Sequence, residues 1–151
     1  MTVRAARPGD LPAVLAIEGA SFATDRISQR NLRRMLARGN CAILVAERRG
    51  VVAGYGLVLF RRGARRARLY SLAVDPAHRR AGVARRLLSA IERVVHRRGF
   101  ETLTLEAGVG NTAATKFYAK MGYSQVASLG PYYADGSAAG RWMKSVNGAA
   151  R

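Results

Sequence analysis

The chain has 151 residues, of which 26 are lysine or arginine and 9 are aspartate or glutamate, so its formal net charge is +17 at pH 7. This length is typical of a single domain with one core, and the lone cysteine, Cys41, excludes an internal disulfide and a thiolate metal cluster. No apolar run approaches the roughly 20 residues that span a bilayer, and the first ten residues lack the apolar core of a signal peptide, so we expect a cytoplasmic protein without a metal site.

The first half of the chain alternates helical and strand patterns. Apolar periodicity and turn residues predict, in chain order, a strand at 2–7, helices at 8–22 and 28–38, a hairpin of strands at 41–47 and 51–61, and a strand at 68–74. Ser28 is the expected cap of the second helix. The residues expected to face inward are Leu11, Val14, Leu15 and Ile17 in the first helix and Leu32, Met35 and Leu36 in the second.

A glycine-containing turn joins the strand at 68–74 to a long amphipathic helix expected at 83–98. The small residues Gly82 and Ala84 let the backbone of this turn pass close to a ligand. The free N–H groups of the new helix and the positive end of its dipole then point at that ligand, so the turn predicts a pyrophosphate cradle. The residues assigned to the cradle are Arg79, Arg80, Ala81, Gly82, Val83, Ala84 and Arg85.

The cradle sequence resembles the acetyl-CoA-binding motif of the GNAT superfamily of N-acetyltransferases, Gln/Arg-x-x-Gly-x-Gly/Ala. A dinucleotide-binding Rossmann protein is the rival interpretation, but the chain lacks three glycines near its N-terminus and an acidic residue after the next strand. The resemblance implies acetyl-CoA as cosubstrate. The backbone of Leu72, Ala73 and Val74, just before the cradle, is then placed to bind the pantetheine arm and the thioester oxygen, although Leu72 and Val74 also suit a core strand.

Glu106 lies at the end of a strand expected at 101–107 and is the candidate general base that removes the proton of the acceptor amine. The alternative is a glutamate at a strand end that pairs with an arginine.

A second motif runs from Asn111 to Tyr123 and predicts a helix over 111–121 that Gly122 closes. Asn111 suits the helix cap and would lie beside the cofactor. Tyr118 falls near the same side of the helix, where its hydroxyl can donate a proton to the leaving thiolate; the alternative is an aromatic residue at the edge of the core. The stretch resembles the second GNAT motif, Asn-x-x-Ala-x-x-x-Tyr-x-x-x-Gly-Phe/Tyr, at every position.

Strands expected at 123–129 and 141–146 complete the GNAT order of elements. The resemblance implies an α/β (α+β) acyl-CoA N-acyltransferase fold, with a mixed sheet of about six or seven strands, about four helices and one domain at 1–147. The tail at 148–151 is short and consists of small or polar residues, so we expect it to fray. Between the last strands, the adjacent tyrosines Tyr132 and Tyr133 fall on a turn, where two neighbours cannot both point inward. We therefore expect them at the acceptor site.

Within the superfamily, the chain is similar to the ribosomal-protein-alanine N-acetyltransferases. Glu106, Asn111, Tyr118 and the tyrosine pair match that family in spacing. Ala107-Gly108 replaces Val-Arg, and Ala139-Gly140 replaces Asp-Ala, so the chain departs from that family's pattern at these two pairs of positions. The stretches 25–28 and 132–136 also resemble a group of bacterial GNAT proteins, a resemblance that names no substrate.

These features predict direct attack of a neutral amine on the bound thioester. An acyl-enzyme on Cys41 is not expected, because Cys41 opens a strand far in sequence from both motifs and no histidine lies near it in the chain. The preferred acceptor is a protein amine, and the alternatives are a small-molecule amine or a non-catalytic CoA-sensing or RNA-associated protein. The excess of arginine has two explanations: the codon bias of a GC-rich genome, or a polyanionic partner such as a ribosomal particle, with nucleic-acid contact secondary. A monomer and a homodimer both remain open.

Overall fold

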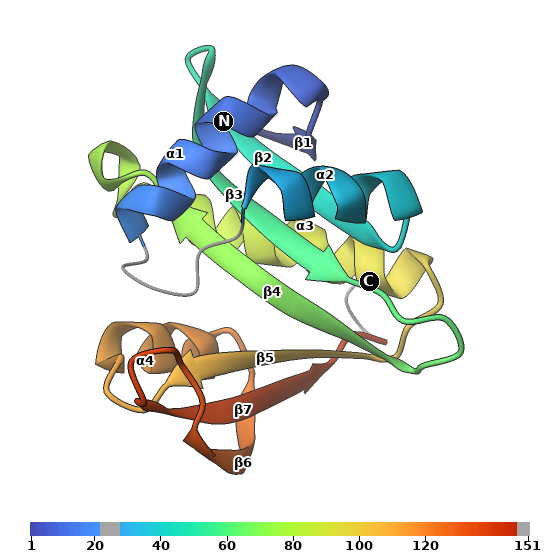
Figure 1. Cartoon of the computed structure of the whole chain (residues 1–151), viewed down its shortest axis with the longest axis vertical. Coiled ribbons are helices and arrows are strands. Elements are labelled where there is room, and N and C mark those ends of the chain that lie inside the picture. Colours follow the sequence, from blue (N-terminus) through green and yellow to red (C-terminus); the bar gives the residue numbers. More distant parts are fainter. Residues whose placement is uncertain (22–27, 148–151) are drawn as a thin grey trace.

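The computed structural model describes residues 1–21 and 28–147, which form a seven-stranded mixed sheet with helices on both faces (Figure 1). The strands are β1 (Thr2–Ala5), β2 (Cys41–Arg48), β3 (Val51–Leu59), β4 (Arg66–Val74), β5 (Thr102–Gly108), β6 (Ser124–Pro131) and β7 (Ala138–Ser145). The α-helices of the described residues are α1 (Leu11–Ser21), α2 (Gln29–Arg38), α3 (Val83–Arg97) and α4 (Thr112–Lys120), with short 3₁₀ helices at Pro8–Asp10 and Pro76–His78. The predicted sheet size and number of helices are confirmed.

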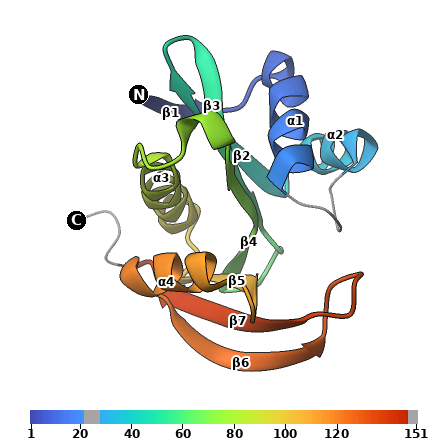
Figure 2. The same cartoon turned by 90° about the vertical axis from the view of Figure 1, so that its left-hand side faces the viewer.

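Two apolar cores form on opposite faces of the sheet. α1 and α2 cover one face of β2–β4, and α3 covers the other (Figure 2). The apolar stripe predicted for α3 makes this contact, and Gly56 of β3 lets the helix approach closely because a Cβ there would overlap with Ile91. The fully buried residues of the stripe are Leu87, Leu88, Ile91 and Val95.

The strand order is β1-β2-β3-β4-β5-β7-β6, and every neighbouring pair is antiparallel except β4 and β5. These two parallel strands pair only over residues 66–69 and 102–105. Beyond that stretch the strands diverge, as Figure 1 shows, while β4 continues to Val74 and β5 to Gly108. Their facing edges therefore keep backbone N–H and C=O groups that no neighbouring strand satisfies, so this gap is a place where a ligand can bind.

Several strand bounds and one side chain differ from expectation. The first strand ends at Ala5 rather than residue 7, because the Arg7 N–H donates to the Asp10 carboxylate over 2.7 Å and a 3₁₀ helix begins instead. Leu36 is 38% exposed, so the prediction that it faces inward is wrong; the buried stripe of α2 is narrow. β7 begins at Ala138, three residues early, because its first residues already pair with β5 and β6.

Some expectations fall on residues outside the described ranges: the end of the first helix at residue 22, the stretch 25–27 and the tail 148–151. Within the described ranges, no helix has the length and apolar character needed to cross a membrane. The same residues bring no group of three potential metal ligands together.

Candidate active site

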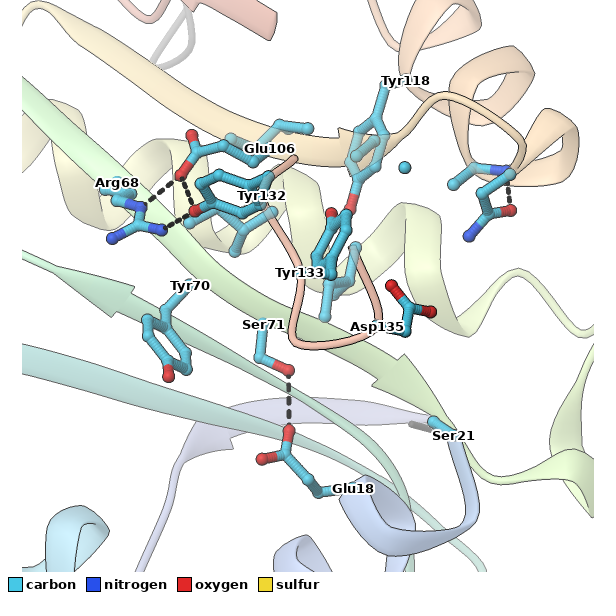
Figure 3. Close-up of a pocket in the computed structure, with 17 residues that line it drawn as sticks. Glu18, Ser21, Arg68, Tyr70, Ser71, Glu106, Tyr118, Tyr132, Tyr133 and Asp135 are labelled. Carbon is cyan, nitrogen blue, oxygen red and sulfur yellow. Dashed lines mark hydrogen bonds and ion pairs between the residues drawn. The ribbon is translucent and has the colours of Figure 1, made fainter. Parts of the chain in front are cut away.

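The gap between β4 and β5 opens into a cavity of about 660 Å³ (Figure 3). Its walls come from the C-terminal end of α1, from β4, β5 and α4, and from the loop between β6 and β7. The polar residues that line it are Glu18, Ser21, Arg68, Tyr70, Ser71, Glu106, Asn111, Tyr118, Tyr132, Tyr133 and Asp135. The two candidate catalytic residues and the two candidate substrate-side tyrosines therefore face the same space.

A second cavity of about 360 Å³ lies at the N-terminus of α3. Gly82 is the N-cap of this helix, with a left-handed backbone (φ 76°) and no side chain to occupy the first free N–H groups. A Cβ at Gly82 would meet no atom within 4 Å, so the backbone faces open space. Arg79, Arg80 and Arg85 line the same cavity, and none of them forms an ion pair with a described residue. Free N–H groups, a helix dipole and three cations fit a diphosphate.

The structure divides the predicted cofactor-binding residues between the two cavities. Seven of them line the second cavity: Val74, Arg79, Arg80, Gly82, Val83, Ala84 and Arg85. Leu72 and Asn111 line the first. Ala73 and Ala81 line neither, and the buried side chain of Ala73 packs in the core next to α1.

Two residues that line the second cavity, His78 and Phe117, were not predicted as site residues from the sequence. His78 ends the proline turn before the cradle, and Phe117 precedes Tyr118 in the second motif. Because both residues lie within or next to the two motifs, the sequence did indicate that they could be close to the ligand.

Glu106 lies at the centre of a charged network. Its side chain is 6% exposed, and its Oε1 is 2.6 Å from Nε of Arg68. The same oxygen accepts a hydrogen bond from the Tyr132 hydroxyl over 3.1 Å, and Oε2 lies 3.7 Å from Nε of Arg141. The arginine pairing considered as the alternative for this residue is therefore present. Proton acceptance by Glu106 requires that these pairs weaken, most directly at Oε2, which has no hydrogen-bond donor among the described residues.

Tyr118 projects from α4 into the cavity, and its hydroxyl points toward Tyr133 in Figure 3. Its ring packs edge-on against Phe117 and Tyr123, at centroid distances of 5.2 and 5.8 Å. Burial, with a smaller effect of Tyr133, raises the pKa of Tyr118. The phenol therefore stays protonated at neutral pH, as a proton donor must.

Asn111 caps α4, as predicted, because its Oδ1 accepts a hydrogen bond from the Ala114 N–H over 3.1 Å. The tyrosine pair lies across the cavity from α1. Tyr132 is 39% exposed, and its ring meets that of Tyr133 edge-on at 4.9 Å. The Tyr132 hydroxyl also accepts a hydrogen bond from Arg68 over 2.6 Å, so this loop is connected to the Glu106 network.

The sequence analysis missed a buried polar cluster of Glu18, Tyr55 and Ser71, of which Glu18 and Ser71 line the larger cavity. A signal was present, because Glu18 follows Leu11 by seven residues and Val14 by four, on the apolar face of α1. A carboxylate on an apolar stripe indicates a special role.

Comparisons with known proteins show the family of the chain. The Acetyltransferase (GNAT) family matches the chain over residues 12–123. The [ribosomal protein bS18]-alanine N-acetyltransferase of Haemophilus ducreyi is 42% identical over 67 residues, which are 44% of this chain and only 46% of that protein. An uncharacterised N-acetyltransferase of Methanocaldococcus jannaschii is 34% identical over 137 residues, covering 90% of this chain and 86% of the relative.

A solved ribosomal-protein-alanine N-acetyltransferase structure from Escherichia coli superposes with a TM-score of 0.84 at 26% identity, over 96% of this chain and 93% of that one. The family match spans both motifs and the helix that carries Glu18. The chain belongs to the acetyltransferase (GNAT) family.

Proposed function

We propose that this protein transfers the acetyl group of acetyl-CoA directly to a primary amine, with a protein N-terminal α-amine or a lysine side chain as the first candidate acceptor. The observation that carries this proposal is that β4 and α4 each contribute residues to both cavities. On β4, Leu72 lines the larger cavity and Val74 lines the second. On α4, Tyr118 lines the larger cavity and Phe117 lines the second. A ligand whose diphosphate occupies the cradle can therefore extend its reactive end into the larger cavity.

Acetyl-CoA supplies the thioester, and the chain supplies binding and proton transfer. The cradle arginines and the start of α3 hold the diphosphate, and the unpaired edge of β4 holds the arm. The amine nitrogen forms a bond to the carbonyl carbon, and the carbon–sulfur bond breaks. Glu106 accepts the proton lost by the nitrogen, and Tyr118 gives a proton to the sulfur. Holding both reactants in one cavity supplies much of the rate enhancement.

Support for a protein acceptor comes from relatives whose names specify an alanine of a ribosomal protein. A small-molecule amine is the second candidate, and a specific observation favours it. Three of the chain's nine acidic residues, Glu18, Glu106 and Asp135, line the larger cavity together with one arginine, Arg68, so acidic residues outnumber basic ones in its wall although the net charge of the protein is +17. Such a cavity also admits a small cationic amine.

The test is acetyl-CoA-dependent thiol release with a panel of N-terminal peptides, lysine peptides and small amines, each with and without RNA competitor. Mass spectrometry of the products then identifies the acetylated atom. Release with peptides supports a protein acceptor, and release only with small amines supports the second candidate. Acetyl-CoA binding without release by any amine would favour a non-catalytic CoA sensor.

Replacing Glu106 by glutamine is expected to remove the part of the acid limb of the pH–rate profile that comes from protonation of this enzyme carboxylate. An amide cannot accept the proton, so the rate should follow the fraction of acceptor that is already neutral. The measurement is kcat/KM against pH for the variant, the parent and Glu101→Gln, an exposed glutamate just before the same strand. A parent-like profile with a lower unfolding temperature would assign Glu106 only to the ion pairs with Arg68 and Arg141.

Replacing Tyr132 or Tyr133 by alanine is expected to raise KM for the acceptor and leave KM for acetyl-CoA nearly constant. Both rings line the larger cavity, away from the cradle, so their loss removes acceptor contacts. Tyr132→Phe is the matched control, because it keeps the ring and removes only the hydroxyl bonds to Arg68 and Glu106. If the alanine variants lose several degrees of thermal stability at unchanged acceptor KM, the loop is structural.

A further inference from the structure

Arginine side chains gather at the end of the molecule where α2 and α3 finish and where the loop between β3 and β4 turns. The Phe60 N–H donates to the Asn40 carbonyl, just after α2, over 2.8 Å, and Cζ of Arg98 lies 4.2 Å from the centre of the Phe60 ring. In Figure 1 these three segments lie on the right-hand side, whereas the turn before α3 lies on the left. We call this surface the basic end, and its exposed arginines are Arg38, Arg61, Arg62, Arg65, Arg66, Arg97 and Arg98.

The charge of the basic end is not neutralised within the described part of the chain. None of its seven arginines forms an ion pair with a described residue. Glu101 lies beside the loop, where its N–H donates to the Arg65 carbonyl over 2.9 Å, but its carboxylate forms no ion pair with a described residue either. Like charges held close together repel and destabilise the folded chain. A bound polyanion would remove this repulsion.

Helix ends account for only two of these charges. Arg38 and Arg97 lie in the last turns of α2 and α3, where a cation stabilises the negative end of the helix dipole. The loop between β3 and β4 turns at Gly63, which has a left-handed backbone with φ 80°, so its shape depends on the glycine. The arginines of this loop and of the start of β4 have no such structural role, and they are Arg61, Arg62, Arg65 and Arg66.

The basic end lies apart from the proposed cofactor cradle. The cradle is at the first turn of α3 and the basic end at its last turn, and the 15 residues of this helix span about 22 Å at 1.5 Å per residue. None of the seven arginines is among the residues that line either cavity. Acetyl-CoA bound in the cradle would therefore leave the basic end free for a second anionic ligand.

The chemistry of the basic end fits phosphate groups. Its cations are arginines, whose planar guanidinium groups bind phosphate oxygens through paired hydrogen bonds. A membrane site would add apolar side chains that enter the lipid, but neither the loop at 60–66 nor the last turn of α3 contributes to the large apolar side chains that the described residues expose. Phe60 is 7% exposed and packs against Phe100, with ring centroids 5.0 Å apart, so its ring is not free to stack on a base.

We propose that the basic end binds the phosphate backbone of a nucleic acid without reading its bases. Phosphates recur at every nucleotide and can meet successive pairs of arginines along the surface. This inference goes beyond the proposed acetyl transfer and does not depend on it. If the acceptor is a protein that itself carries RNA, the basic end would hold the RNA while the acceptor amine enters the larger cavity.

The test measures binding of a fluorescently labelled oligouridylate by anisotropy at several salt concentrations, with acetyl-CoA at saturation to occupy the cradle. The logarithm of the binding constant should fall linearly with the logarithm of the salt concentration. Arg61→Gln/Arg62→Gln should make this slope shallower by about 1.4, since each phosphate contact of a single strand contributes about 0.7. An oligothymidylate of the same length should bind with the same affinity and slope, because the contacts are to the backbone.

Arg48→Gln/Arg49→Gln is the matched control, because it removes the same charge from the turn between β2 and β3, at the end of β2 remote from the basic end. This variant should keep the salt slope of the parent. Unchanged acetyl-CoA affinity in Arg61→Gln/Arg62→Gln would show that this variant is folded.

Four results would overturn the proposal. The first is a parent-like salt slope in Arg61→Gln/Arg62→Gln, and the second is an equal change of slope in the control variant, which would attribute binding to net charge alone. The third is displacement of the oligouridylate by acetyl-CoA, which would place the nucleic acid in the cradle. The fourth is equally strong competition by polyglutamate at the same concentration of charges, which would make an acidic protein the partner. None of these results bears on whether the enzyme acetylates an amine.

Discussion

Replacing Gly82 by glutamate is expected to weaken acetyl-CoA binding by about 100-fold or more. Gly82 has a left-handed backbone, and a Cβ there meets no atom within 4 Å, so the new side chain enters the open cradle. Its carboxylate would face the diphosphate at the N-terminus of α3, and a like-charge contact of this kind costs several kcal/mol. Calorimetric titration with acetyl-CoA measures the loss directly.

Gly82→Gln is the control that separates charge from shape. Glutamine has nearly the same size and meets the same backbone strain at φ 76°, a cost of order 1–3 kcal/mol that both variants share. The difference between the two variants therefore reports the charge alone. Equal affinities for the glutamate and glutamine variants would mean that the diphosphate lies elsewhere, whatever their stability.

The parts of the fold that depend on short-range signals were predictable from the sequence. Ser28 and Asn111 cap α2 and α4 as expected, because a cap needs only a side-chain oxygen and the next three residues. The turn around Gly82 likewise depends only on a few consecutive residues. The end of the first strand was wrong because the Asp10 carboxylate competes for the Arg7 N–H, a choice between two local structures of similar energy.

The parts of the site that depend on strand register were not predictable. Glu106 meets Arg141 because β5 and β7 pair with these residues opposite each other, and it meets Arg68 only through the short pairing of β4 with β5. The spacing of residues in the sequence determines neither the register of β5 with β7 nor that of β4 with β5. Glu18 is different, since its place on the apolar face of α1 was visible, but its partners Tyr55 and Ser71 belong to two strands that the sequence does not align with that helix.

Replacing Tyr118 by phenylalanine is expected to lower kcat by about 100-fold, a typical loss for a general acid, without changing acetyl-CoA affinity. Phenylalanine keeps the edge-on packing against Phe117 and Tyr123. The hydroxyl has no hydrogen-bond partner among residues 1–21 and 28–147, so its removal leaves no described polar group there without a partner. The measurement is steady-state kinetics together with acetyl-CoA titration.

Tyr123→Phe is the matched control for Tyr118→Phe. It also removes one hydroxyl from a buried tyrosine, but that hydroxyl donates to Glu92 in the core, away from both cavities. Tyr123→Phe should therefore lower the unfolding temperature and leave kcat unchanged, the reverse of the effect at Tyr118. Because burial raises the pKa of Tyr118, the phenol is protonated throughout the neutral range, and the loss in Tyr118→Phe should not vary with pH there. A parent-like kcat in Tyr118→Phe would assign protonation of the sulfur to water.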